Sequence, residues 1–155
     1  MARFEGQVRT EWLREAGADR RMRLLEDFVF VDDNNFRWVA PAGALVDGAS
    51  IPEGFWNSVG TPYVGDYRRA SVLHDVACGE KKQPHTAVHR MFYDAMITDG
   101  VPVWTAQQMY TAVRIFGPKW VVVAGGPGLP PAAAPVSKPL DIDELEAALD
   151  AALGE

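Results

Sequence analysis

Residues 66–79 (DYRRASVLHDVACG) constrain the fold more than any other stretch, because they place an adjacent His and Asp inside an apolar helical pattern. Apolar residues recur at the i, i+3, i+4 spacing of one helix face: Tyr67, Ala70, Leu73 and Ala77. Asp66 is suited to the N-cap and Gly79 to the end of this helix, which predicts about thirteen helical residues between them. We therefore expect a helix here, with the rest of the fold arranged around it.

A polar stripe lies beside the apolar face and consists of Ser71, His74, Asp75 and Cys78. Adjacent side chains on a helix diverge by about 100°, so His74 and Asp75 do not point at each other. Each needs a partner elsewhere in the chain. The candidate partners are Asp47, Ser50, His85, His89 and Asp94.

The chain before this helix has the composition of a β-sheet region. A run of β-favouring residues at 22–31 is followed by the turn cluster DDNN at 32–35 and by a second β-favouring run at 36–39. Asn tolerates the positive φ of a tight turn, which predicts a β-hairpin. Three further elements are expected: a strand at 3–9, a helical turn or edge strand at 11–17, and a strand at 44–46.

The remaining elements are predicted mainly from helical periodicity. Ser50 and Glu53 have capping-box spacing, which predicts a short helix there. Longer helices are expected at 85–98 and 104–116, where Gly and Pro follow the periodic residues. The apolar run at 119–124 is typical of a strand.

The end of the chain differs in composition and charge. Residues 125–140 are mostly Pro, Ala and Gly, a linker composition, and residues 141–155 hold six acidic residues and no Lys or Arg. Subtracting those six from the 21 acidic residues leaves 15, equal to the 15 basic residues, so residues 1–140 are formally neutral. A nucleic-acid partner is not expected without a basic surface.

These patterns predict an α+β protein in three parts. A globular domain at 1–124 packs a small antiparallel β-sheet on about three α-helices, a Pro/Ala-rich linker follows at 125–140, and an acidic amphipathic helix occupies 141–155. The hydrophobic fraction of 48% supports a folded domain. No run approaches the length of a membrane span, no N-terminal signal pattern is present, and a single Cys excludes an internal disulfide framework.

Metal binding is one chemistry that fits the polar residues. His85 and His89 have i, i+4 spacing, which is compatible with shared ligation of one ion. With His74 and Asp75 they would form a His/carboxylate set suited to zinc or a similar ion.

Acid–base chemistry and a purely structural role are the alternatives. His74, held by a carboxylate such as Asp47, could activate water, and Ser50 could act as its nucleophile, although capping competes for that hydroxyl. Structurally, the His-Asp pair could bond to backbone around Asp47 and tie the helix to the hairpin. Cys78 is expected to be a small core residue.

Four pieces of sequence occur in a specific order: VDGASIP at 46–52, FW at 55–56, ASVLHD at 70–75 and RMFYDAM at 90–96. In this combination the chain resembles, over roughly residues 3–117, domain-of-unknown-function family 1353, which is found mainly in tailed phages and prophages. The resemblance implies a location in the virion or the host cytoplasm and leaves the biochemical role open.

Two positions depart from the pattern of that family. An aromatic residue that usually follows the His-Asp pair is replaced within residues 76–78, and His89 stands where relatives tend to have Asp. His89 cannot orient the imidazole of the pair as an anion would. The His-Asp helix is also similar to that of secreted phospholipase A2, where the His is the base and the Asp binds calcium, but this chain lacks that enzyme's cysteines and Gly-rich calcium loop.

Two functions follow as expectations. The first, which we favour at this point, is a phage accessory or virion-associated structural protein of the tail or connector region. It would dock on other phage structural proteins through residues 125–155, in a helix-in-groove mode. Its anchors would be Ile142, Leu145, Leu149 and Leu153. The second is a hydrolase acting on cell-envelope or lipid substrates, with or without a metal, whose catalytic residues are His74, Asp75 and Asp47.

Overall fold

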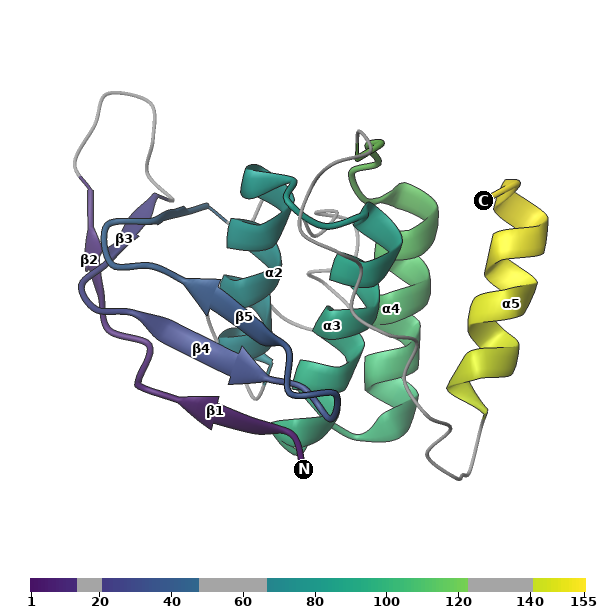
Figure 1. The fold of residues 1–155 in the computed structure, drawn as a ribbon, viewed down its shortest axis with the longest axis horizontal. Helices are drawn as coiled ribbons and strands as arrows, with labels where there is room; N and C mark the ends of the chain where they lie inside the picture. The colour runs from purple at the N-terminus through teal and green to yellow at the C-terminus, as the bar shows by residue number, and fades with distance from the viewer. Residues whose placement is uncertain (14–20, 48–66, 123–140) are drawn as a thin grey trace.

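The structure, a computed structural model, describes residues 1–13, 21–47, 67–122 and 141–155 (Figure 1). These residues form short strands followed by helices, which confirms the α+β class. The elements are β1 (Arg3–Glu5), β2 (Thr10–Trp12), β3 (Met22–Leu24), β4 (Phe28–Val31), β5 (Arg37–Ala40), β6 (Leu45–Val46), α2 (Arg68–Glu80), α3 (His85–Thr98), α4 (Val103–Phe116) and α5 (Ile142–Leu153).

The strands form two three-stranded antiparallel sheets, in the orders β1-β4-β5 and β2-β3-β6, instead of one sheet. The long β-favouring run therefore divides, with β3 in one sheet and β4 in the other. The strand expected at 3–9 ends at Glu5 because Gly6 adopts a φ of +82°, and a Cβ at Gly6 would lie 2.7 Å from the carbonyl oxygen of Asp27. Edge strand β2 covers the start of the 11–17 stretch, whose end lies outside the described residues.

The predicted hairpin is confirmed as β4 and β5. Phe28 pairs with Ala40 and Val31 with Arg37 across the two strands, and Asn35 takes the positive φ of 62° in the turn. The Asp32 carboxylate closes this corner, since its Oδ1 accepts from the Phe36 N–H at 3.0 Å and its Oδ2 from the Trp38 indole at 3.1 Å. The hydrogen bonds of the buried Asp32 carboxylate therefore come from residues of the same hairpin.

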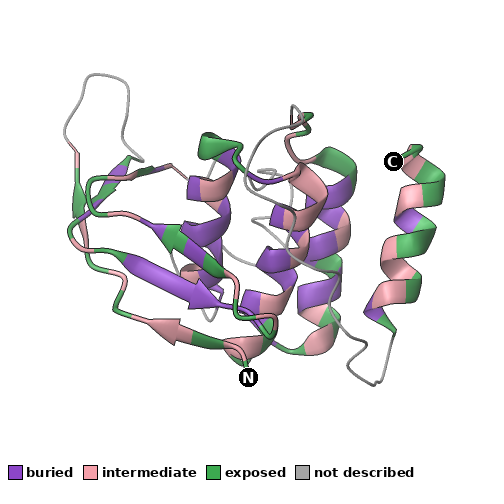
Figure 2. Ribbon diagram, in the orientation of Figure 1, coloured by how far each residue is buried: buried purple, intermediate pink, exposed green. Residues whose placement is uncertain are grey.

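The helices follow the sheets as a series of layers (Figure 1). Helix α2 packs on β4, β5 and β6 with one face and on α3 with another, α3 packs on α4, and α4 packs on α5. Burial extends around most of α2 and α3 (Figure 2), as expected for helices with neighbours on opposite sides. The polar stripe of α2 consequently lies in the interior, where His74 and Cys78 are buried.

Three predicted boundaries change. Helix α2 continues past Gly79 to Glu80 and ends at Lys81, which adopts the left-handed conformation with φ 54°; Asp66 lies outside the described residues. Helix α4 begins one residue earlier than predicted, directly after Pro102. The strand predicted at 119–124 is wrong over 119–122, where the backbone pairs with no described strand and the Trp120 side chain donates to the Gln83 carbonyl. Residues 123–124 and the helix expected near Ser50 lie outside the described residues.

The C-terminal helix packs on this chain's own α3 and α4. Asp141 caps it by accepting from the Asp143 N–H at 3.0 Å. The predicted apolar stripe faces the core, with Ile142 and Leu149 buried and Leu145 and Leu153 partly buried against it. Docking of this stripe on another protein stays a prediction, and such a partner would have to replace these intramolecular contacts.

Candidate functional site

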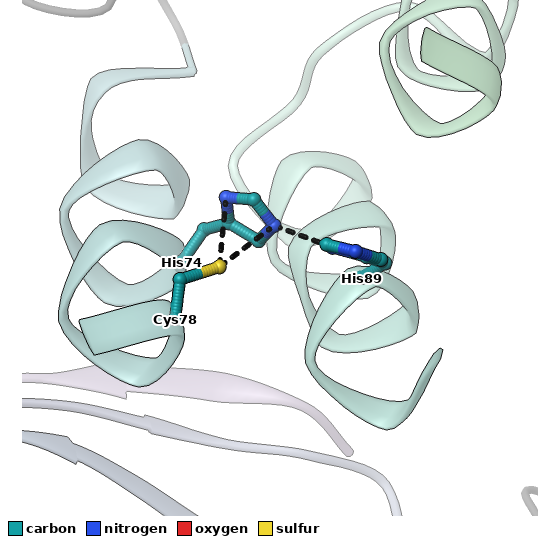
Figure 3. Close-up of side chains that lie close together, drawn as sticks. All are labelled: His74, Cys78 and His89. Atoms are coloured by element: carbon teal, nitrogen blue, oxygen red, sulfur yellow. Dashed lines mark hydrogen bonds between the residues drawn. The ribbon is translucent and has the colours of Figure 1, made fainter. Parts of the chain in front are cut away.

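The seam between α2 and α3 brings His74 and His89 into direct contact. The short connection from Lys81 to Pro84 turns the chain back, so that α3 lies beside α2. His74 Nε2 then lies 2.8 Å from His89 Nδ1 (Figure 3), and both imidazoles have an exposed fraction of 0%. The two rings come from separate helices and meet in the interior.

Hydrogen bonding fixes which nitrogens carry the protons. His89 Nε2 lies 3.1 Å from the carbonyl oxygen of Pro118, which can only accept, so Nε2 is the protonated nitrogen of neutral His89. The lone pair of His89 is therefore on Nδ1 and accepts a hydrogen bond from His74 Nε2–H. A neutral His74 then has its own lone pair on Nδ1.

Burial keeps both imidazoles neutral. It lowers the pKa of His74 well below the usual range, and the neighbouring His89 lowers it further. Burial also lowers the pKa of His89 to about 4, although the hydrogen bond to Pro118 acts in the opposite direction. Neutral imidazole is the form that ligates metal ions.

The third member of the cluster is Cys78, one helical turn after His74 on α2. Its Sγ lies 3.6 Å from His74 Nε2 and 4.0 Å from His74 Nδ1 (Figure 3). Donor atoms of His74, Cys78 and His89 all lie within 4.8 Å of one another. Cys78 is buried, as expected, but it is not among the ligands predicted from the sequence. Its i, i+4 relation to His74 is the sequence signal that could have indicated it.

Among the described residues, Asp75 and Asp47 contact each other and do not hydrogen-bond His74 as catalytic partners would. The Asp75 Oδ2 accepts from the backbone N–H of Asp47 at 2.9 Å and so connects α2 to the end of β6. This contact matches the structural alternative for Asp75. His74 instead lies against the Phe92 ring, with centroids 4.5 Å apart, and points to His89.

The remaining candidates lie outside the cluster. His85 contacts the ring of His89 edge-on at 5.8 Å between centroids, and its Nε2 lies 3.3 Å from Glu155 Oε1. Asp94 pairs with Arg90 at 3.2 Å. The predicted metal set therefore divides: His74 and His89 converge, whereas Asp75 and His85 contact other groups, and Ser50 lies outside the described residues.

A short segment covers the far side of His89. The Pro118 carbonyl accepts a hydrogen bond from His89 Nε2. The Trp120 ring lies edge-on to His89 and His85, with ring centroids 6.3 and 5.8 Å away. The Trp120 indole N–H in turn donates to the Gln83 carbonyl at 2.8 Å. A metal-ligating His commonly donates its second N–H to a carbonyl, and this contact aims Nδ1 of His89 at the cluster.

Two of the donor separations can be compared with those of a zinc centre, and the third, between Cys78 and His89, lies within 4.8 Å. With Zn–N of about 2.0–2.1 Å and Zn–S of about 2.3 Å, a tetrahedral site places nitrogen and sulfur about 3.6 Å apart and two nitrogens about 3.3 Å apart. The Cys78–His74 separation of 3.6 Å already fits, whereas the 2.8 Å between the imidazoles would have to widen by about 0.5 Å. Ligation through His74 Nε2 would also require its proton to move to Nδ1.

The layers and this cluster define a small α+β protein with two imidazoles and one thiol buried between neighbouring helices. The family described as Protein of unknown function (DUF1353) matches residues 22–113, more than half of the chain, and the chain belongs to this family. The resemblance drawn from the sequence is thereby confirmed. The association with tailed phages and the similarity to phospholipase A2 stay predictions.

Two relatives in Sinorhizobium fredii (strain NBRC 101917 / NGR234) are similar to this chain. The uncharacterized protein y4jT is 46% identical over 99 residues, which cover 64% of this chain and 30% of that protein. The uncharacterized protein y4iH is 37% identical over 109 residues, which cover 70% of this chain and 46% of that protein. The chain thus spans less than half of either relative. No solved structure matches it, and no described helix has the length and apolar character needed to cross a membrane.

Proposed function

We propose that the chain binds a zinc-class metal ion through His74, Cys78 and His89, and that this centre is the functional core of the domain. The observation that carries the proposal is the convergence of three buried donor atoms, all within 4.8 Å, from two helices. Nitrogen and sulfur donors together are typical of zinc ligation and exclude the hard cations that prefer oxygen.

Two features of the donors support this proposal. Both imidazoles are neutral at pH 7 because burial lowers the pKa of each, so neither must lose a charge before it ligates. The Pro118 carbonyl also fixes the orientation of His89 before any ion binds. Cys78 would release its proton and supply the thiolate, which gives zinc binding a dependence on pH.

Hydrolysis is the second candidate function, and the number of ligands favours it. Three protein ligands leave one position of a tetrahedral zinc ion, and catalytic zinc sites use that position for water. The expected substrates are those inferred from the sequence, cell-envelope or lipid molecules. Cys78 and His89 would replace Asp75 and Asp47 as the residues that act with His74.

A role as a virion structural protein is a separate proposal with a separate test. The acidic helix that motivated it packs on α3 and α4 of the same chain, so the structure lends it less support than the cluster lends to metal binding. Mass spectrometry of gradient-purified particles would detect this chain at a fixed copy number if it is a structural component.

The metal proposal is tested on the full chain, stripped with a chelator and dialysed against zinc. Elemental analysis should find about one zinc per wild-type chain, and stoichiometric binding should be lost in His74→Ala, Cys78→Ser and His89→Ala. Cobalt(II) offers a second readout, since a thiolate ligand gives a charge-transfer band in the near ultraviolet that Cys78→Ser should abolish.

His85→Ala is the matched control, because this histidine borders the cluster without contributing a donor. It should retain one zinc per chain. Circular dichroism of each metal-free variant separates loss of ligation from loss of fold. Wild-type protein that binds no zinc, or equal losses in His85→Ala and His89→Ala, would overturn the proposal.

A further inference from the structure

Helix α5 supplies the negative charges for a basic face on α3 and α4. Arg114 on α4 has an exposed fraction of 0%, donates to the Tyr110 hydroxyl at 2.7 Å and pairs with Asp150 and Glu155 of the C-terminal segment. Arg90 on α3 pairs in the same way with Asp143 and Glu146. Removing α5 would leave both guanidinium groups without these carboxylates. The surface of α3 and α4 that carries Arg90 and Arg114 is therefore complementary in charge to an acidic helix.

The side chain of Glu155 extends this seam toward the metal site. Gly154 adopts a φ of 72° and turns the chain back at the end of α5. The Glu155 side chain, 15% exposed, then lies near three cationic or ionisable groups: Arg114 at 3.0 Å, His85 at 3.3 Å and Lys119 at 3.4 Å. One carboxylate therefore joins α5 to α4, α3 and the segment after α4.

Lys119 lies between the two residues that cover His89. Pro118, on one side of it, accepts the hydrogen bond from His89 Nε2, and Trp120, on the other side, places its ring against His89. A contact that holds Lys119 therefore also restrains the cover, residues 118–120. Within the described residues, Glu155 is the acidic partner of Lys119 in an ion pair.

We propose that α5 is a latch on the His74–Cys78–His89 cluster: Glu155 holds Lys119, and thereby the cover, against His89, and release of α5 opens the site. The inference deepens the proposed function, on which it rests for its purpose, since the latch would control entry and loss of the metal. The latch itself is a property of the metal-free chain and is tested there.

The test compares Glu155→Gln with Glu144→Gln, a change at an exposed acid of α5. The full-length, metal-free proteins are treated with diethyl pyrocarbonate, and tandem mass spectrometry follows modification of His89 separately from His85. Loss of about 1.4 kcal/mol of local stability raises the population of the open state about tenfold, so Glu155→Gln should be modified at His89 about tenfold faster. Glu144→Gln should match the wild type.

Amide hydrogen exchange locates the change. Faster exchange at 117–122 in Glu155→Gln, with β4 unchanged, supports local opening. Unchanged His89 modification in Glu155→Gln, or equal acceleration in both variants, would overturn the latch, as would exchange that rises in α5 and leaves 117–122 protected. The outcomes separate from those of the metal test: a chain that binds no zinc can still show the latch, and a chain that binds zinc can lack it.

Discussion

Two helix seams in this protein contain polar groups, one with neutral donors and the other with ion pairs. The α2–α3 seam, formed by His74, Cys78 and His89, holds neutral donors that face one another. The α5 seam, where α5 meets α3 and α4, holds Arg90 and Arg114 against carboxylates of α5. Both seams join helices, yet only the second contains opposite charges.

The difference shows what decides the charge of a buried group. Burial, followed by the neighbouring His89, lowers the pKa of His74, and no carboxylate of the described residues acts against them. Burial also acts to lower the pKa of Arg114, but the Asp150 hydrogen bond and the other partners more than offset it, and the pKa is raised. The arginines of the α5 seam are thus held in ion pairs with carboxylates, whereas the α2–α3 seam keeps neutral imidazole and thiol groups within 4.8 Å of one another.

The largest expected effect comes from removing the charge of the α5 seam. Arg114→Met should lower the free energy of unfolding by about 4 kcal/mol, because it removes a fully buried guanidinium that hydrogen-bonds Tyr110, Asp150 and Glu155. Urea denaturation measures this cost. Arg114→Lys is the control, since it keeps the charge and loses the planar fork, and it should cost less. A cost below about 1 kcal/mol in Arg114→Met would show that the seam does not depend on charge pairing.

The next effect is a pH dependence specific to the α2–α3 seam. His89 has a folded pKa of about 4, against an ordinary value of 6.5, so the unfolded chain binds its proton first as the pH falls. The contribution of neutral His89 to the free energy of unfolding is therefore complete above pH 6.5 and is lost as the pH falls to about 4. The loss amounts to about 3 kcal/mol.

This dependence is measured as a difference between two metal-free proteins. Asp94, whose burial raises its pKa to about 6, acts in the opposite direction over the same range, but it does so equally in the wild type and in His89→Gln. The stability advantage of the wild type over His89→Gln should therefore shrink by about 3 kcal/mol between pH 7 and pH 4. A constant difference would mean that His89 is not neutralised by burial.

The same contrast explains what the sequence could predict. The hairpin was predictable because Asp32 and Asn35 act within a few residues of chain, and the helices because their periodicity is local. The division into two sheets depends on which distant strands pair, and local patterns do not contain that information. The sequence predicts Cys78 only as a core residue, because any further role depends on which side chain of α3 lies opposite it. The packing of α3 on α2 places His89 there, and local sequence patterns do not contain that information.

The smallest expected change in stability comes from replacing glycines, and it should differ in sign between Gly154, in the turn after α5, and Gly79, inside α2. Gly154 has a φ of +72° and open space around a Cβ, so Gly154→Ala should cost about 1 kcal/mol from backbone conformation alone. Gly79 lies inside α2, also with open space, so Gly79→Ala should stabilise by about 0.5–1 kcal/mol. Thermal unfolding of both variants gives the sign of each change. If Gly154→Ala were neutral, the turn would not be what directs Glu155 toward Lys119, and the two seams would be joined by other contacts.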